Sequence, residues 1–155
     1  LSTLHTNDAP GAINRLLELG VPYYLLRASL LGVMAQRLVR TLCPHCKEPT
    51  EITVEDWNTL TRPWNAALPK QAYRAVGCIE CRETGYHGRA GLYEIMVLNE
   101  RIKGLITAET DLGVLRKNAY REGMRSLRLS GAQKVAAGLT TVAEVLRVTP
   151  HHESL

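Results

Sequence analysis

The sequence contains two short cysteine motifs, Cys43-Pro-His-Cys46 and Cys78-Ile-Glu-Cys81, and no other cysteine. The Cys-x-x-Cys spacing lets a tight turn direct two sulfur atoms at one point. Two such turns supply the four thiolates of a tetrahedral zinc site. We therefore predict that Cys43, Cys46, Cys78 and Cys81 bind a structural Zn²⁺ ion. A closed four-thiolate site has no open position for substrate, so it stabilises a fold and performs no chemistry.

The gap between the two motifs, residues 47–77, is longer than in the usual zinc ribbon, and it leaves alternatives open. The cysteines can form disulfides, which require an oxidising compartment. They can also form a thioredoxin-like redox pair, although neither motif lies in a βαβ pattern. His45, inside the first motif, is a possible competing ligand. Arg40, Lys47 and Arg82 are the neighbouring cations expected to offset the negative charge of a four-thiolate centre.

The segment around the cysteines differs in composition from the rest of the chain. Residues 43–86 hold all the cysteines, both tryptophans and several prolines. We interpret residues 43–86 as a zinc-binding tetracysteine module inserted into the main body. Thr53 predicts the start of a short helix, and Trp57 and Trp64 are expected in the core of this module.

The residues before the module, 1–42, are predicted to belong to an α/β body. Thr3–His5 is expected to be the end of a buried strand. Asp8 is a good helix N-cap and Pro10 suits the first turn, so a helix is predicted from there to Gly20. A second helix is predicted from Pro22, because hydrophobic residues follow at helical spacing, and an extended segment follows it. The hydrophobic positions of the second helix are Leu26, Leu30, Val33, Met34 and Leu38, and the extended segment is Val39–Leu42.

The residues after the module, 87–150, are predicted to contain a returning strand, Ala90–Val97, and then a C-terminal helical subdomain. Asp111 is expected to cap one helix, and Thr141 with Glu144 forms a capping box for another. Residues 151–155 are expected to be a frayed tail, in which His151 and His152 are too few to form a metal site.

The composition is that of a globular protein and does not select a ligand. The chain has 155 residues, of which 45% are hydrophobic, and a formal net charge of +4. The longest apolar stretch, Val21–Val39, is interrupted by Arg27, Gln36 and Arg37, so we expect a soluble protein. Because the chain begins at Leu1 in what reads as a strand, we expect it to be a fragment.

Several stretches together resemble one protein family. The residues from Leu1 to Ala9, Leu-Ser-Thr-Leu-His-Thr-Asn-Asp-Ala, resemble the His box of the type II secretion and type IV pilus-assembly ATPases. Gln36–Lys47 and Gly77–Gly91 resemble the entry to and exit from the tetracysteine module of that family. The end of the chain, Gly138–Thr149, is similar to the family's C-terminus. The resemblance covers nearly the whole chain, with residues 48–73 as the divergent part.

The resemblance implies a fold and an activity. The family consists of hexameric, RecA-like P-loop ATPases on the cytoplasmic side of the bacterial inner membrane, which use ATP and Mg²⁺ to drive protein secretion or pilus assembly with inner-membrane platform proteins. The chain contains no G-x-x-x-x-G-K-[ST] phosphate loop. It is therefore expected to form the C-terminal edge of such a core, with residues 1–42 in that core, and to be inactive alone.

Two residues acquire candidate roles from the resemblance. His5 matches the His-box histidine and is expected to sense the γ-phosphate of ATP. Arg89, in a glycine-flanked turn, is expected to contact the nucleotide or a subunit boundary, or to be an ordinary exposed arginine. Arg37 and Arg40 are expected to form structural ion pairs, and His87 to be a turn residue.

A different class of function remains an alternative. Paired cysteines and a basic net charge also occur in zinc-ribbon modules that bind nucleic acids or other proteins. Here the basic residues are spread along the chain and aromatic residues make up 5%. A nucleic-acid partner is therefore not expected.

Overall fold

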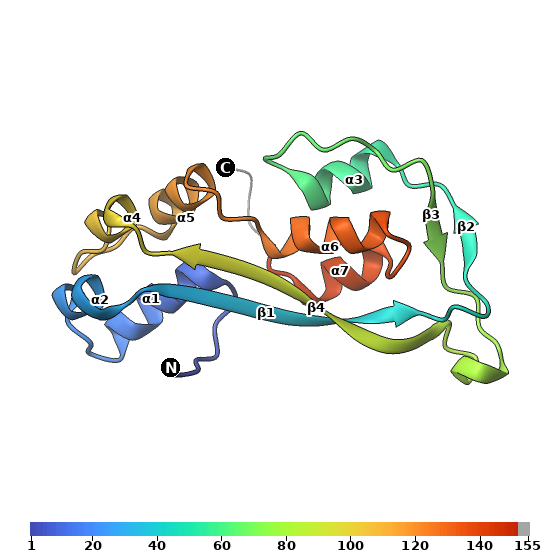
Figure 1. Cartoon of the computed structure of the whole chain (residues 1–155), viewed down its shortest axis with the longest axis horizontal. Coiled ribbons are helices and arrows are strands. Elements are labelled where there is room, and N and C mark those ends of the chain that lie inside the picture. Colours follow the sequence, from blue (N-terminus) through green and yellow to red (C-terminus); the bar gives the residue numbers. More distant parts are fainter. Residues whose placement is uncertain (152–155) are drawn as a thin grey trace. The chain divides into compact units, whose positions relative to one another are not determined.

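The computed structural model describes residues 1–151, which form α-helices, one short 3₁₀ helix and two small sheets (Figure 1). The elements in chain order are α1 (Ala9–Glu18), α2 (Tyr23–Ser29), β1 (Gly32–Leu42), β2 (Glu48–Thr50), α3 (Val54–Thr61), β3 (Ala72–Arg74), η1 (Ile79–Cys81), β4 (Tyr86–Val97), α4 (Glu100–Gly104), α5 (Leu112–Arg121), α6 (Leu127–Ala136) and α7 (Val142–Val148). Within this part of the chain, no helix combines the length and the apolar character that a membrane span requires. The predicted frayed tail lies, beyond His151, outside the described residues.

Helix α1 begins where the sequence predicts it. The Asp8 side chain accepts the backbone N–H of Gly11 at 2.9 Å, and Pro10 lies in the first turn. The predicted strand end at Thr3–His5 is wrong, because residues 1–6 have no regular secondary structure. A strand needs a neighbour to complete its hydrogen bonds, and none of the described strands pairs with this segment.

The predicted second helix is correct only as far as α2, and its remainder forms strand β1. The cause is that a spacing of four residues places side chains on one face of a helix and also on one face of a strand. In β1, Ala35 and Val39 are buried on one face. Met34 and Leu38, also four residues apart, are exposed on the other face.

Strands β1 and β4 form a two-stranded sheet. At one end Leu98 donates its N–H to the Leu31 carbonyl at 3.0 Å, and at the other Cys43 donates to Gly85 at 3.0 Å. The strands therefore run in opposite directions, as Figure 1 also shows. The predicted returning strand is confirmed, although it begins at Tyr86 and not at Ala90.

The chain divides into two compact units. One consists of Leu1–Gln36 and Tyr93–Ser126, and the other of Arg37–Leu92 and Leu127–His151. The cysteine segment thus belongs to the same unit as α6 and α7. The predicted boundaries of the tetracysteine module, at residues 43 and 86, group these parts differently and stay a prediction.

The first unit is held by α1 packed on α5, with α4 also against α5. Ile13 of α1, Ile102 of α4 and Leu115 of α5 are fully buried. Asp111 caps α5 as predicted, because its carboxylate accepts the N–H of Val114 at 3.0 Å.

In the second unit, α3 packs against α6 and α7, which also pack on each other. Gly131 of α6 lies so close to α7 that a Cβ atom there would meet Cγ1 of Val145 at 2.3 Å. Thr141 caps α7 as predicted by accepting the N–H of Glu144 at 3.3 Å.

Helix α3 joins the cysteine segment to this core. Thr53 caps α3 by accepting the N–H of Asp56 at 3.1 Å. Trp57 is buried, as predicted, and its indole N–H donates to the Ala66 carbonyl at 3.0 Å. Strands β2 and β3 pair antiparallel beside it, with Pro49 opposite Tyr73.

Candidate functional site

The four cysteines come together from two separate turns. Cys43 directly follows β1, and Cys46 lies in the turn before β2; Cys78 caps the 3₁₀ helix η1, and Cys81 ends it. The four Sγ atoms all lie within 4.8 Å of one another. Among the described residues, His45 does not join this cluster, and its side chain is exposed.

The distances between sulfurs fit a shared metal ion. Cys43 and Cys78 are 3.9 Å apart, and the Cys46–Cys81 and Cys78–Cys81 pairs are each 3.8 Å apart. A disulfide requires about 2.05 Å, and all four cysteines are free. A regular tetrahedron with metal–sulfur bonds of about 2.3 Å has sulfur–sulfur edges of about 3.8 Å. The cluster is therefore compatible with zinc binding.

Backbone N–H groups point at two of the sulfurs. Gly77 donates to Cys46 Sγ at 3.3 Å, and both Cys78 and Gly85 donate to Cys81 Sγ at 3.2 Å. Such donors stabilise a thiolate more than a thiol, because they interact with its full negative charge. The turns thus supply part of the electrostatic compensation that a thiolate centre requires.

The turn that closes the second motif depends on an unusual backbone. Arg82 and Glu83 adopt positive φ angles of 55° and 61°, and Gly85 follows with a φ of 77°. A Cβ atom at Gly85 would lie 2.7 Å from the Cβ of Ala75. Glycine is required here both for its conformation and for the space, and it places its N–H on Cys81.

The thiols differ in acidity. Burial raises the pKa of the Cys46 thiol to about 11. Burial also acts to raise the pKa of Cys81, but the N–H groups of Cys78 and Gly85 outweigh it and lower this pKa to about 6. Burial thus opposes the thiolate form of Cys46, and a cation bound by the four sulfurs would favour it.

Two of the three cations predicted to balance the sulfurs, Lys47 and Arg40, are engaged elsewhere. Lys47 Nζ donates to the Gly138 carbonyl at 2.8 Å and lies 4.5 Å from the centre of the Tyr73 ring. Arg40 pairs with Glu144 of α7, which confirms the structural ion pair expected for it. Lys47 therefore fastens the first cysteine turn to the end of α6.

Glu144 is a buried carboxylate held by two arginines. It accepts from Arg40 Nη2 at 2.5 Å, from the Arg40 backbone N–H at 3.1 Å and from Arg147 Nη2 at 3.0 Å. Burial acts to raise the pKa of Glu144, but the arginine hydrogen bonds outweigh it and lower this pKa to about 2. The carboxylate is therefore charged at neutral pH and fixes both guanidinium groups.

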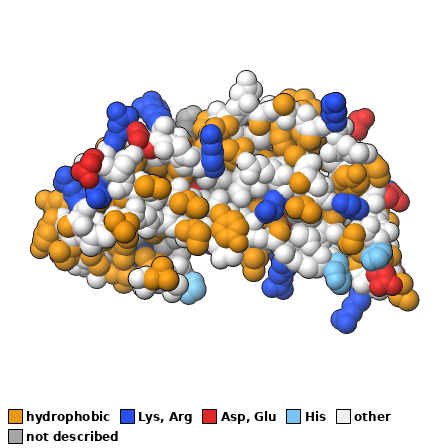
Figure 2. Space-filling model, in the orientation of Figure 1, with side chains coloured by type: hydrophobic (Ala, Val, Ile, Leu, Met, Phe, Trp, Pro, Cys, Tyr) orange, Lys and Arg blue, Asp and Glu red, His pale blue; other side chains and the backbone are white. Residues whose placement is uncertain are grey.

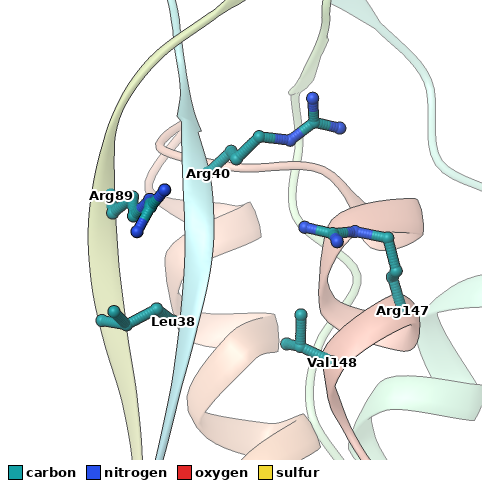
Figure 3. Close-up of a pocket in the computed structure, with 5 residues that line it drawn as sticks. All are labelled: Leu38, Arg40, Arg89, Arg147 and Val148. Carbon is teal, nitrogen blue, oxygen red and sulfur yellow. The ribbon is translucent and has the colours of Figure 1, made fainter.

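Arg89 lies beside this pair. A hollow of about 480 Å³ is lined by Leu38, Arg40, Arg89, Arg147 and Val148 (Figure 3). Its arginines come from β1, β4 and α7. Among the described residues, none forms a hydrogen bond or ion pair with the Arg89 side chain. The hollow therefore presents more positive than negative charge, with an apolar wall of Leu38 and Val148.

His5 lies in the irregular segment before α1, and its side chain is exposed. Three residues after His5, the buried carboxylate of Asp8 accepts a hydrogen bond from Arg116 Nη2 of α5 at 2.8 Å. His5 is far from the cysteines in sequence, and the two belong to different compact units. Its role as a phosphate sensor stays a prediction.

Sequence reasoning missed the partners of the two buried carboxylates. Arg116 lies 108 residues from Asp8, and Arg40 lies 104 residues from Glu144. Helix-capping rules identify Asp8 and Glu144 as residues at helix starts, but local rules do not identify a distant arginine. His87 was expected in a turn and lies in β4, because this strand begins at Tyr86.

On the face drawn in Figure 2, the basic side chains of the described residues do not form one continuous surface. Figure 2 shows Lys and Arg side chains at several separate places, with hydrophobic and acidic side chains between them. A nucleic-acid surface usually gathers basic and aromatic side chains along one groove. This face therefore gives no support to the nucleic-acid alternative.

The chain matches one protein family over almost its whole length. The family described as "Type II/IV secretion system protein" matches residues 1–147. The chain belongs to this family, in agreement with the resemblance of its motifs.

Relatives of both branches are similar to the chain. It is 51% identical over 150 residues to the type IV pilus assembly ATPase TfpB of Acinetobacter baylyi, covering 97% of this chain and 26% of that protein. It is 47% identical over 149 residues to the type II secretion system protein E of Pseudomonas aeruginosa, covering 96% and 29%. The type IV pilus assembly ATPase PilB of Myxococcus xanthus is 42% identical over 152 residues, covering 94% and 26%. The chain thus spans about a quarter of the length of these relatives.

Proposed function

We propose that the chain forms the C-terminal part of a hexameric ATPase that powers type II protein secretion or type IV pilus assembly. The family match over residues 1–147 carries this proposal, and relatives named as ATPases support it. In this proposal the complete motor works in the cytoplasm, at the inner face of the bacterial inner membrane. Its partners are the platform proteins of the secretion or pilus machine.

The tetracysteine centre is proposed to hold one structural Zn²⁺ ion. The sulfur–sulfur distances of 3.8–3.9 Å and the N–H donors on Cys46 and Cys81 support it. Four thiolates complete the coordination shell, so the ion supplies folding energy and no catalysis. The centre would fix the turns at both ends of the segment that carries α3.

Residues 1–42 are proposed to lie at the edge of a RecA-like core. One face of the β1–β4 sheet supports this, because Met34, Tyr93, Ile95 and Val97 are all more than 40% exposed on it. Apolar patches of this kind usually mark a contact surface. We propose that the remainder of the ATPase core covers this face.

His5 is proposed to sense the γ-phosphate of ATP. Its exposed imidazole stands just before an anchored helix start, so it can meet a ligand bound by other parts of the motor. The phosphate loop and the Mg²⁺ ligands belong to those other parts, since no phosphate-loop motif occurs in this sequence. The chain alone is therefore proposed to be inactive.

Arg89 is proposed to contact a nucleotide phosphate or an acidic group of a neighbouring subunit. The hollow that it shares with Arg40 and Arg147 supports an anionic ligand, because guanidinium groups bind phosphate and carboxylate through paired N–H donors. Glu144 neutralises part of the charge of Arg40 and Arg147, which leaves Arg89 as the least compensated cation.

The proposed motor function is tested by steady-state ATP hydrolysis of the complete protein with His5→Ala. We expect kcat to fall about 100-fold while the affinity for ATP changes less than about 3-fold, because a sensor acts on the hydrolysis-competent arrangement. His45→Ala, an exposed histidine of the cysteine turn, is the matched control and should leave both values unchanged. Normal turnover in His5→Ala would contradict the sensor role, and ATP hydrolysis by residues 1–155 alone would contradict the proposed division of the active site.

A further inference from the structure

The start of helix α1 is fixed by an unusual set of buried charged groups. The Asp8 carboxylate uses both oxygens: Oδ1 accepts from the Gly11 N–H at 2.9 Å, and Oδ2 accepts from Arg116 Nη2 at 2.8 Å and Nε at 3.2 Å. The next residue, Ala9, donates its N–H to Glu94 Oε1 at 2.8 Å. Two carboxylates and one guanidinium thus meet at two successive residues.

These groups come from three elements of one compact unit. Asp8 precedes α1, Glu94 lies in β4 and Arg116 lies in α5. Their side chains are withdrawn from solvent: Asp8 is 3% exposed, Glu94 is 2% exposed and the Arg116 side chain is 14% exposed. Screening by water and salt is weak at such a site, so these contacts hold the helix start more firmly than surface ion pairs do.

Asp8, the residue that Arg116 holds, lies three positions after His5 in the chain. Residues 1–6 have no regular structure, and Thr6 Oγ1 donates to the Asp8 carbonyl at 3.1 Å, which folds this segment back onto the helix start. The position of the His5 backbone therefore depends on where Asp8 is held. Capping of α1 requires only Asp8 Oδ1, so the Arg116 contact is additional to what the helix needs.

We propose that Arg116 is a positioning residue for His5, and that the Asp8–Arg116 pair couples helix α5 to the proposed phosphate-sensing segment. This inference rests on the proposed role of His5. A movement of α5 would shift Asp8 and, through it, the segment that carries His5. A change in the contacts that hold α5 would thus alter the rate of ATP turnover.

The test is a double-mutant cycle on ATP turnover of the complete motor. Arg116→Ala would leave a buried unpaired carboxylate and risks unfolding. The double variant Asp8→Asn/Arg116→Gln removes both charges, and Asn remains a good N-cap. We expect this variant to lower kcat about 10-fold with less than a 2-fold change in KM. Combined with His5→Ala, it should lower kcat no further, because the two changes remove the same contribution.

The matched control is Arg101→Gln. Arg101 also pairs with a carboxylate, that of Glu122 at 3.0 Å, in the same compact unit, but the Arg101 side chain is 68% exposed. It should leave kcat and KM unchanged. A second measurement, hydrogen exchange of the peptide covering residues 1–9, should show exchange about 10-fold faster in Asp8→Asn/Arg116→Gln and unchanged in Arg101→Gln.

The outcomes distinguish a failure of the sensor role of His5 from a failure of the positioning role of Arg116. If His5→Ala leaves kcat unchanged, the proposed sensor role is wrong. If His5→Ala lowers kcat but the folded Asp8→Asn/Arg116→Gln variant turns over normally, the positioning role is wrong and the sensor role stands. Additive losses in the combined variant would also overturn the proposal, because they would show that Arg116 acts independently of His5.

Discussion

The tetracysteine centre and the His5 segment differ in how firmly the chain itself fixes them. The four sulfurs lie within 4.8 Å of one another, and backbone N–H groups of Gly77, Cys78 and Gly85 point at them. His5 is exposed and, among the described residues, its side chain makes no hydrogen bond or ion pair. We therefore expect changes at the cysteines to alter stability. Under the proposed function, we expect changes at His5 to alter only ATP turnover by the complete motor.

The largest effect is expected for Cys78→Ser. Loss of one thiolate should release the metal, and the lost folding energy is on the order of 10 kcal/mol. Because α3 packs on α6 and α7, and Lys47 binds the Gly138 carbonyl, hydrogen-exchange protection should fall through 43–86 and also in α6 and α7. Helices α1 and α5 should keep theirs. Equal loss of hydrogen-exchange protection in both compact units would show that the two units fold as one cooperative unit that depends on the metal.

A smaller loss is expected for Gly85→Ala. The new Cβ would lie 2.7 Å from the Ala75 Cβ, at a residue with a φ of 77°. Strain and overpacking together should lower the free energy of unfolding by about 3 kcal/mol. Gly104→Ala is the control, since a Cβ there meets nothing within 4 Å, and it should change stability by less than about 1 kcal/mol. Urea denaturation measures the free energy of unfolding of both variants. Equal losses would contradict the close packing of Gly85 against Ala75.

A third effect concerns pH. The folded-state pKa of Glu144, about 2, lies below the usual value of about 4.3. A lowered pKa means that the charged carboxylate adds stability above about pH 4.3, and that this stability is lost as the pH falls towards 2. Its size is about 2 kcal/mol, because Arg40 and Arg147 are half exposed and partly screened.

Glu144→Gln should therefore lower the stability by about this amount at pH 7. The difference between the two proteins in urea denaturation should stay constant from pH 7 to pH 5 and decline only below about pH 4.3. A difference that already disappears between pH 7 and pH 5 would mean that another group is responsible.

The smallest effect is expected for His5→Ala in residues 1–155. Because the imidazole is exposed and forms no hydrogen bond or ion pair with a described residue, the free energy of unfolding should change by less than about 0.5 kcal/mol. Thermal denaturation of the two proteins decides this. A loss above about 1 kcal/mol would assign His5 a structural role and weaken the contrast with the cysteines.

Local signals in the sequence predicted much of the structure. The caps at Asp8, Thr53, Asp111 and Thr141 depend on residues within one turn of the helix, and all four are confirmed. The four cysteines lie together as expected, because only a shared site explains two Cys-x-x-Cys turns in a chain with no other cysteine.

What the sequence did not predict depends on distant partners. The first part of β1, up to Leu38, was predicted to be helical, since the four-residue spacing of Met34 and Leu38 suits both structures and only the pairing of β1 with β4 decides. The extended segment predicted at Val39–Leu42 is confirmed as the end of β1. The contacts of Arg116 with Asp8 and of Arg40 with Glu144 span more than 100 residues. No pattern within one element specifies such a contact.

The most direct test of the central claim is the metal content and sulfur coordination of the purified chain. Elemental analysis should find one zinc ion per polypeptide, and X-ray absorption at the zinc edge should find four sulfur ligands at about 2.3 Å. Cys78→Ser should abolish this signal, while His45→Ala should retain it. A chain that folds without metal, or one in which Cys43 and Cys46 are joined by a disulfide, would contradict the account.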